Sequence, residues 1–238
     1  VKARLAFEQA SSMPGNDKIR EQALYNYALI IHETSYSPFA ESVTVFERFL
    51  NEYPKSKYAD NVNSYLLDVY MNTTSYDAAL ASIAKINNPG RSILEAKQQL
   101  LYKKAMDLYA NAKYADAAQM FGSAIEYMDL NKSLATDAYF WRAESYYRSG
   151  NVNRAESDYS RYISLAPGKN TRNYVLSRYG LGYINYNKEK YANALDNFTE
   201  MLNRVSVVKM PDNLVADACI RVADCHFYMR SLDKATDY

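Results

Sequence analysis

The chain has 238 residues, of which 48% are hydrophobic and 23% charged, and its 28 Lys and Arg nearly balance 27 Asp and Glu to give a net charge of +1. This composition is typical of a folded globular protein and excludes a disordered or fibrous chain. Without a run of basic residues we expect no nucleic-acid partner, and without a stretch of about 18 apolar residues we expect no membrane span.

One pattern recurs along the chain: an aromatic or apolar residue, a small residue three positions later and a large residue four positions beyond that. Its copies begin at Phe39, Tyr76, Tyr114, Val152, Tyr191 and Leu232. The intervals between them are 37, 38, 38, 39 and 41 residues. Offsets of three and four place these side chains on one face of a helix, so each copy predicts an amphipathic second helix.

A first helix is predicted before each of these second helices. From the second copy onward, another small or apolar residue stands twelve residues before the small residue, within a further amphipathic stretch; these residues are Leu67, Ala105, Ala143, Gly182 and Ala223. Small residues that face each other let two helices of a hairpin approach closely. Since one hairpin cannot bury both of its faces, stacking on neighbouring hairpins must stabilise it.

The predicted elements, in chain order, are a partial second helix, five hairpins and a final incomplete hairpin. Their ranges are roughly 1–13, 18–54, 57–88, 92–129, 133–167, 171–208 and 212–238. Because both terminal elements are partial, we expect the natural protein to extend in both directions and residues 1–238 to be one solenoid fragment.

Helix breakers and capping residues lie where this division needs them. Pro54, Pro89, Pro167 and Pro211 end second helices or open the next unit, and Gly150 marks a turn inside a unit. We expect an irregular turn over residues 34–38. The predicted N-caps of first helices are Ser56, Ser92 and Thr136.

These units resemble the tetratricopeptide repeat family. The fourth hairpin carries the pattern best, through Tyr139, Ala143, Tyr146, Gly150, Ala155, Tyr159, Tyr162 and Pro167. The units are a few residues longer than the usual length of about 34. The resemblance implies an all-α fold, a right-handed α-α superhelix or solenoid of about five full hairpins with partial repeats at both ends.

The resemblance also implies a location and a type of partner. The segment 46–60 is similar to a linker in bacterial envelope repeat proteins, which implies the periplasm or cell envelope, with the cytoplasm as the alternative. First helices of this family line a concave groove that binds a protein or peptide.

Candidate groove residues stand three before, one after and four after the small residue of successive first helices. They are Tyr102, Met106, Tyr109, Phe140, Glu144, Tyr147, Tyr179, Tyr183, Tyr186, Asp224 and Phe227. Offsets of seven residues share a helix face, so aromatic columns would follow the groove. Tyrosine combines contact area with a hydroxyl group, as protein-binding surfaces require.

Two alternatives to a general peptide groove concern the same residues. The rings could pack between neighbouring helices of a structural spacer or a self-assembling homo-oligomer. The family members that grip the C-terminal carboxylates of chaperones need basic groove residues, where this chain has Tyr102, Phe140 and Tyr179. We therefore expect no carboxylate clamp of that kind.

The sequence offers no constellation for catalysis. It has two histidines, His32 and His226, without a His-Glu-x-x-His pair or a phosphate-binding glycine loop. Cys219 and Cys225 stand six apart on a predicted helix, too far to pair, and are expected to be small packed residues. We therefore expect no enzyme activity, catalytic residue, metal or cofactor.

Overall fold

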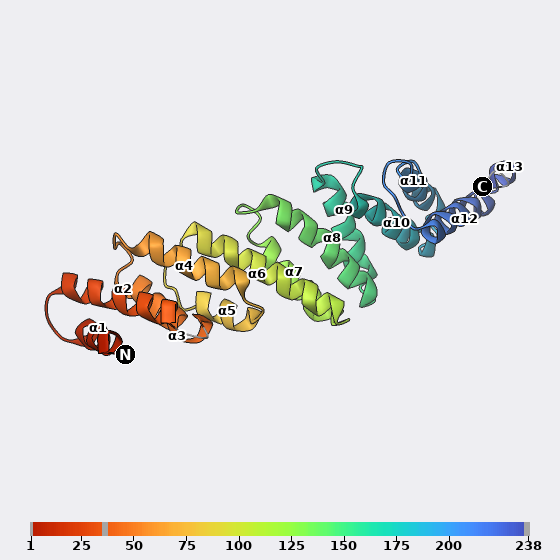
Figure 1. Ribbon diagram of the computed structural model, residues 1–238. Helices are drawn as coiled ribbons and strands as arrows, with labels where there is room; N and C mark the ends of the chain where they lie inside the picture. Colours follow the sequence, from red (N-terminus) through yellow and green to blue (C-terminus); the bar gives the residue numbers. More distant parts are fainter. Residues whose placement is uncertain (1, 35–37, 236–238) are drawn as a thin grey trace. The chain divides into compact units, whose positions relative to one another are not determined.

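The computed structural model describes residues 2–34 and 38–235, and all regular structure within them is α-helical (Figure 1). The helices are α1 (Lys2–Ser12), α2 (Asp17–Thr34), α3 (Pro38–Glu52), α4 (Ala59–Asn72), α5 (Tyr76–Ile83), α6 (Arg91–Ala110), α7 (Tyr114–Ile125), α8 (Lys132–Arg148), α9 (Val152–Leu165), α10 (Arg172–Asn187), α11 (Tyr191–Leu202), α12 (Asp212–Tyr228) and α13 (Leu232–Ala235). The all-α prediction is confirmed. The predicted irregular turn falls largely on residues 35–37, outside the described residues.

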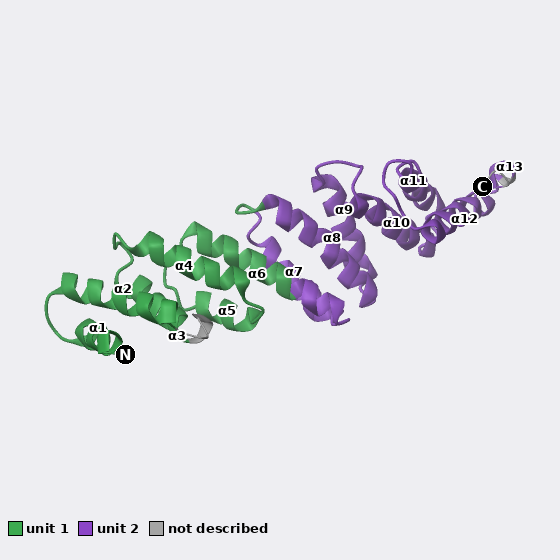
Figure 2. Cartoon of the chain, in the orientation of Figure 1, with its two compact units in different colours: residues 1–104, 129–131 green, residues 105–128, 132–238 purple. Residues whose placement is uncertain are grey.

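The chain forms two compact units, which Figure 2 colours separately: unit 1 is residues 1–104 with 129–131, and unit 2 is residues 105–128 with 132–238. In unit 1, α1 packs on α2, α2 on α3, and α3 on both α4 and α5. In unit 2 each helix from α7 to α13 packs on the next, and α8 also contacts α10. Successive packing of helices is thus confirmed within the units, and the division into repeat ranges stays a prediction.

A buried polar network ties three helices of unit 1 together. The hydroxyl groups of Tyr70 in α4 and Ser82 in α5 lie 2.6 Å apart, and Ser82 donates in turn to Glu47 of α3. A separate, exposed bond runs from Asn51 of α3 to the carbonyl of Lys85, at 2.8 Å. These bonds orient α3 against the hairpin that follows it, next to a core that includes the fully buried Phe46, Phe49 and Leu66.

In unit 2 small residues let neighbouring helices approach closely, as predicted. Ala143, Ala155 and Ala194 are fully buried. Gly182 of α10 faces Phe198 of α11, and no space for a Cβ atom exists between them. The expectation that Gly182 serves close helix packing is confirmed.

Each turn between a first and a second helix of unit 2 contains a residue in the left-handed conformation. These residues are Ala112, Gly150, Glu189 and Arg230, with φ values of 58°, 82°, 58° and 60°. In the first turn, Lys113 N–H donates to Leu108 O at 2.9 Å and Ala112 N–H to Tyr109 O at 3.0 Å, the two bonds of a Schellman motif, and equivalent pairs occur in the other three turns. The motif fixes the backbone of Tyr109, Tyr147, Tyr186 and Phe227, whose carbonyls accept the second bond.

The predicted N-caps are wrong. Ser92 and Thr136 lie inside α6 and α8, and the Thr136 hydroxyl donates back to the carbonyl of Lys132 at 2.8 Å. Ser56 lies ahead of the N-cap position of α4, where its hydroxyl accepts from Tyr58 N–H at 3.0 Å. Two other side chains do cap first helices: Asn16 accepts from Lys18 N–H of α2 at 2.9 Å, and Thr171 accepts from Tyr174 N–H of α10 at 3.2 Å. The positions of Pro and Gly between units therefore predict where a first helix begins less accurately than the hydrogen bonds of its capping side chain do.

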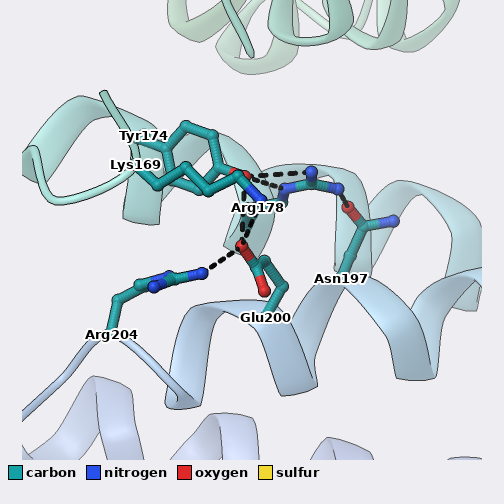
Figure 3. A network of polar contacts seen from close by, with 6 residues as sticks. All are labelled: Lys169, Tyr174, Arg178, Asn197, Glu200 and Arg204. Atoms are coloured by element: carbon teal, nitrogen blue, oxygen red, sulfur yellow. Dashed lines mark hydrogen bonds and ion pairs between the residues drawn. The ribbon is translucent and has the colours of Figure 1, made fainter. Parts of the chain in front are cut away.

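Polar side chains also hold α10 against α11, as Figure 3 shows. Arg178 donates to the hydroxyl of Tyr174 and, at 3.1 Å, to Asn197. Tyr174 donates to Glu200 at 3.2 Å, and Arg204 donates to the same carboxylate oxygen at 2.9 Å. With this side of α10 bound to α11, other faces of the helix are left to form the site described next.

Candidate partner-binding groove

A cavity of about 700 Å³ lies in unit 2 and is lined mainly by the first helices of successive hairpins, which are α6, α8, α10 and α12. Its lining residues are Tyr109 of α6; Phe140, Trp141, Glu144, Tyr147 and Arg148 of α8; Tyr159 of α9; Arg172, Asn173, Leu176, Tyr179, Gly180 and Tyr183 of α10; and Leu214 of α12. Seven of these fourteen residues are aromatic. The cavity is large enough for several side chains of a partner.

Glu144 is the one acidic residue of this lining, and both of its oxygens are already in use. The Tyr159 hydroxyl donates to Oε1 at 2.5 Å, and the Tyr109 hydroxyl donates to Oε2 at 3.4 Å. Burial and the neighbouring carboxylate raise the pKa of Tyr159, and they raise that of Tyr109 to about 12. Both phenols are therefore neutral donors near pH 7 and hold the carboxylate in place.

The rings of the lining are held by one another and by α12. Trp141 meets the Tyr109 ring edge-on at 5.2 Å between centroids, and Tyr179 meets Tyr183 in the same way at 5.0 Å. The hydroxyls of Tyr179 and Tyr183 both donate to Asp217 Oδ2, at 2.7 Å and 2.5 Å. Rings fixed in this way bind with little loss of conformational entropy.

Two guanidinium groups give the cavity its charge. Arg148 lies 5.7 Å from the centre of the Tyr109 ring, and its side chain is 52% exposed. Arg172, the first residue of α10, is exposed. Against the single carboxylate of Glu144, these two cations leave the lining with a net charge of +1.

The structure brings six of the eleven sequence-predicted groove residues into this cavity. They are Tyr109, Phe140, Glu144, Tyr147, Tyr179 and Tyr183. Phe140 is only 1% exposed and packs on Tyr159 and Tyr162, so it belongs to the core beneath the cavity.

The other five predicted residues do not line the cavity. Tyr102 and Met106 are half-buried on α6, and Tyr102 belongs to unit 1. Tyr186 donates to Asp224 of α12 at 3.3 Å, and Phe227 is 60% exposed.

Sequence reasoning missed several lining residues. They are Trp141, Arg148, Tyr159, Arg172, Asn173, Leu176, Gly180 and Leu214. The repeat register considered only three offsets from each small residue, and Trp141 and Leu176 lie at others. The single Trp of the chain, placed within the best-matching repeat, was a signal that could have found Trp141.

Groups outside the cavity show ordinary packing. Cys225 is buried, and burial raises the pKa of its thiol to about 11. Cys219 is half-buried, and neither cysteine forms a disulfide bond. In residues 2–34 and 38–235, no three His, Cys, Asp or Glu side chains are grouped to hold a metal ion, and no helix there is long and apolar enough to cross a bilayer.

Residues 102–170, which include α7, α8 and α9, match the sequence model of the tetratricopeptide repeat family. The tetratricopeptide resemblance is confirmed. This matched segment of tetratricopeptide repeats contributes Tyr109 and all the α8 and α9 residues that line the cavity. A comparison with curated protein sequences finds no significant match.

Solved structures resemble this chain at low sequence identity. BtubC (BKLC) from P. vanneervenii is 12% identical, with a TM-score of 0.55 over 98% of this chain and 87% of that chain. PilW, described as a type IV pilus biogenesis factor, is 14% identical, with a TM-score of 0.46 over 94% and 91% of the two chains. YrrB, described as a TPR protein with an unusual peptide-binding site, is 17% identical, with a TM-score of 0.42 over 92% and 97%. At such identities the first likeness shows the fold alone, and the two lower TM-scores support no conclusion about this chain.

Proposed function

We propose that this chain is a protein-interaction scaffold that binds a protein or peptide partner in the cavity of unit 2. The observation that carries the proposal is the cavity itself, whose wall combines fixed aromatic rings with two guanidinium groups. Trp, Tyr and Arg are the residues that contribute most to binding energy at protein interfaces.

The polar groups of the cavity support binding better than catalysis. The Glu144 carboxylate accepts from two phenols, and Tyr179 and Tyr183 donate to Asp217. These phenols have raised pKa values, so they stay protonated at pH 7 and act as hydrogen-bond donors instead of general bases. We therefore propose a scaffold with neither a catalytic residue nor a cofactor.

The compartment is a separate proposal. We propose the periplasm or cell envelope because residues 46–60, which form the end of α3, a turn and the start of α4, are similar to linkers of envelope repeat proteins. Fractionation of the source cells tests this: recovery with cytoplasmic markers would contradict it.

Binding is tested by selecting peptides from a random displayed library and titrating them into the chain. Trp141 is the only tryptophan and lines the cavity, so its fluorescence should change on binding. Tyr147→Ala should weaken binding about tenfold or more, as at an interface hot spot. The matched control is Tyr228→Ala, which removes a tyrosine that is 53% exposed and lies outside the cavity lining.

Two outcomes would contradict this function. One is that no peptide binds with saturation. The other is that Tyr147→Ala and Tyr228→Ala have equal effects while both variants keep the thermal unfolding midpoint of the native chain.

A second candidate function is self-association through α12. Ile220 and Phe227 stand seven residues apart on one face of this helix and are 52% and 60% exposed, although both are large and apolar. Light scattering tests this candidate: Phe227→Ser should convert an oligomer to a monomer, and a native chain that is already monomeric would eliminate it.

A further inference from the structure

A hydrogen bond recurs between first helices of unit 2. The Tyr109 hydroxyl of α6 donates to Glu144 of α8 at 3.4 Å, and the Tyr186 hydroxyl of α10 donates to Asp224 of α12 at 3.3 Å. Each tyrosine stands four residues after the small residue of its helix, and each carboxylate stands one residue after the small residue of the next first helix. The same two repeat positions therefore supply donor and acceptor at both junctions.

The junction between α8 and α10 lacks this acceptor. Tyr147 is the donor-position residue of α8, but the acceptor position of α10 holds Tyr183, whose own hydroxyl donates to Asp217. Within residues 2–34 and 38–235, the Tyr147 hydroxyl makes no hydrogen bond, and its side chain is 36% exposed. Tyr147 lines the cavity with its donor available.

Cationic groups of the lining favour a negatively charged acceptor at this place. None of the ion pairs among residues 2–34 and 38–235 includes Arg172. Arg148 approaches Glu144 only to 3.9 Å, and that carboxylate is already held by two phenols. A carboxylate brought by a ligand would therefore gain a hydroxyl donor at Tyr147 and would enter a cavity whose lining carries two cations against one anion.

We propose that the partner places a side-chain carboxylate of an internal Asp or Glu in this cavity, where it accepts from Tyr147 and is attracted by the positive charge that Arg148 and Arg172 give the lining. The ligand then completes the bond that the chain itself makes at the two neighbouring junctions. The partner is thus an acidic segment whose apolar residues pack on Trp141 and Leu176. This inference rests on the proposed function and names the chemistry of its partner.

The test compares two peptides of alternating leucine and glutamate or leucine and glutamine, acetylated and amidated so that neither has a terminal charge. The glutamate peptide should bind roughly tenfold more tightly to the native chain, since a hydrogen bond to a charged group has about this effect on affinity. Tyr147→Phe and Arg172→Gln should each reduce this preference severalfold. Tyr186→Phe, whose hydroxyl is paired with Asp224, is the matched control and should keep it.

A further variant supplies the absent acceptor within the chain. Tyr183→Glu places a carboxylate at the repeat position of Glu144 and Asp224, so it should compete with the ligand and abolish the preference for the glutamate peptide. Thermal unfolding of each variant shows whether the fold is kept, and Tyr147→Phe, which retains the ring, tests the proposal if Tyr183→Glu does not fold.

The outcomes separate this inference from the function beneath it. Equal affinity of the two peptides, or a preference that survives Tyr147→Phe and Arg172→Gln together, overturns the acidic partner and leaves the scaffold function standing. If neither these peptides nor any library peptide binds, the scaffold function fails, and the inference fails with it.

Discussion

Gly182 of α10 lies against the ring of Phe198 of α11, so closely that a Cβ atom on Gly182 would stand 2.6 Å from Cε1 of that ring. Phe198 is fully buried and cannot move aside into solvent. Helix packing in unit 2 thus depends on a residue without a side chain.

Gly182→Ala should destabilise the chain by about 1–3 kcal/mol, the usual effect of overpacking a core. Gly168→Ala is the control, because no atom lies within 4 Å of its added Cβ. Urea unfolding measures both free energies, and equal values for the two variants would contradict the account of packing.

The turn residue Glu189 gives a prediction of opposite sign. Its φ of 58° is left-handed, a conformation that costs an L-residue about 1–2 kcal/mol and costs glycine nothing. Glu189→Gly should therefore stabilise the chain by about 1 kcal/mol, and Gly150→Ala should destabilise it by a similar amount. The thermal unfolding midpoints of the two variants, compared with that of the native chain, test both predictions. A lower midpoint for Glu189→Gly would contradict them.

Arg142 and Asp158 form the buried ion pair between α8 and α9. Two bonds of 2.7 Å and 2.8 Å join them, and their side chains are 21% and 8% exposed. Asp158→Ala leaves a largely buried guanidinium unpaired and should cost about 3 kcal/mol. The double variant Arg142→Met with Asp158→Leu should regain most of the lost free energy of unfolding. If the double variant lost as much as Arg142→Met and Asp158→Leu lose separately, added together, the ion pair would not explain the cost.

Alkaline pH should unfold unit 2 through its paired tyrosines. Burial, with Glu144 beside Tyr109 and Asp224 beside Tyr186, raises the pKa of both phenols from 10.0 to about 12. A raised folded pKa contributes stability that is complete below the unfolded pKa of about 10 and is lost as pH rises through about 12.

Denaturant titrations over this pH range measure the loss. The double variant Tyr109→Phe with Tyr186→Phe should show a flatter decline than the native chain. Identical slopes would show that these two phenols do not control the alkaline transition.

The sequence predicts the helical hairpins well because packing enforces the repeat. Ala155 and Ala194 must be small and Phe198 must be large for the helices to pack. The sequence intervals between such residues therefore predict where the helices lie. Helix starts were predicted poorly. Thr136 has the chemistry of an N-cap, but α8 continues for four residues ahead of it and the hydroxyl bonds within the helix.

The cavity was only partly predictable for a related reason. Tyr147 and Tyr183 follow the repeat register, whereas Arg172 and Leu214 line the cavity through the positions of α10 and α12 in space. Three left-handed turn residues carry no sequence signal either, since Ala112, Glu189 and Arg230 are not glycine.

The most direct test of the central claim maps a library-selected peptide onto the chain by backbone amide chemical shifts. The account predicts perturbations that centre on Trp141, Tyr147 and Leu176, which line the cavity. Perturbations confined to α9 and α11, with these three amides unmoved, would show that partners bind elsewhere and would contradict the account.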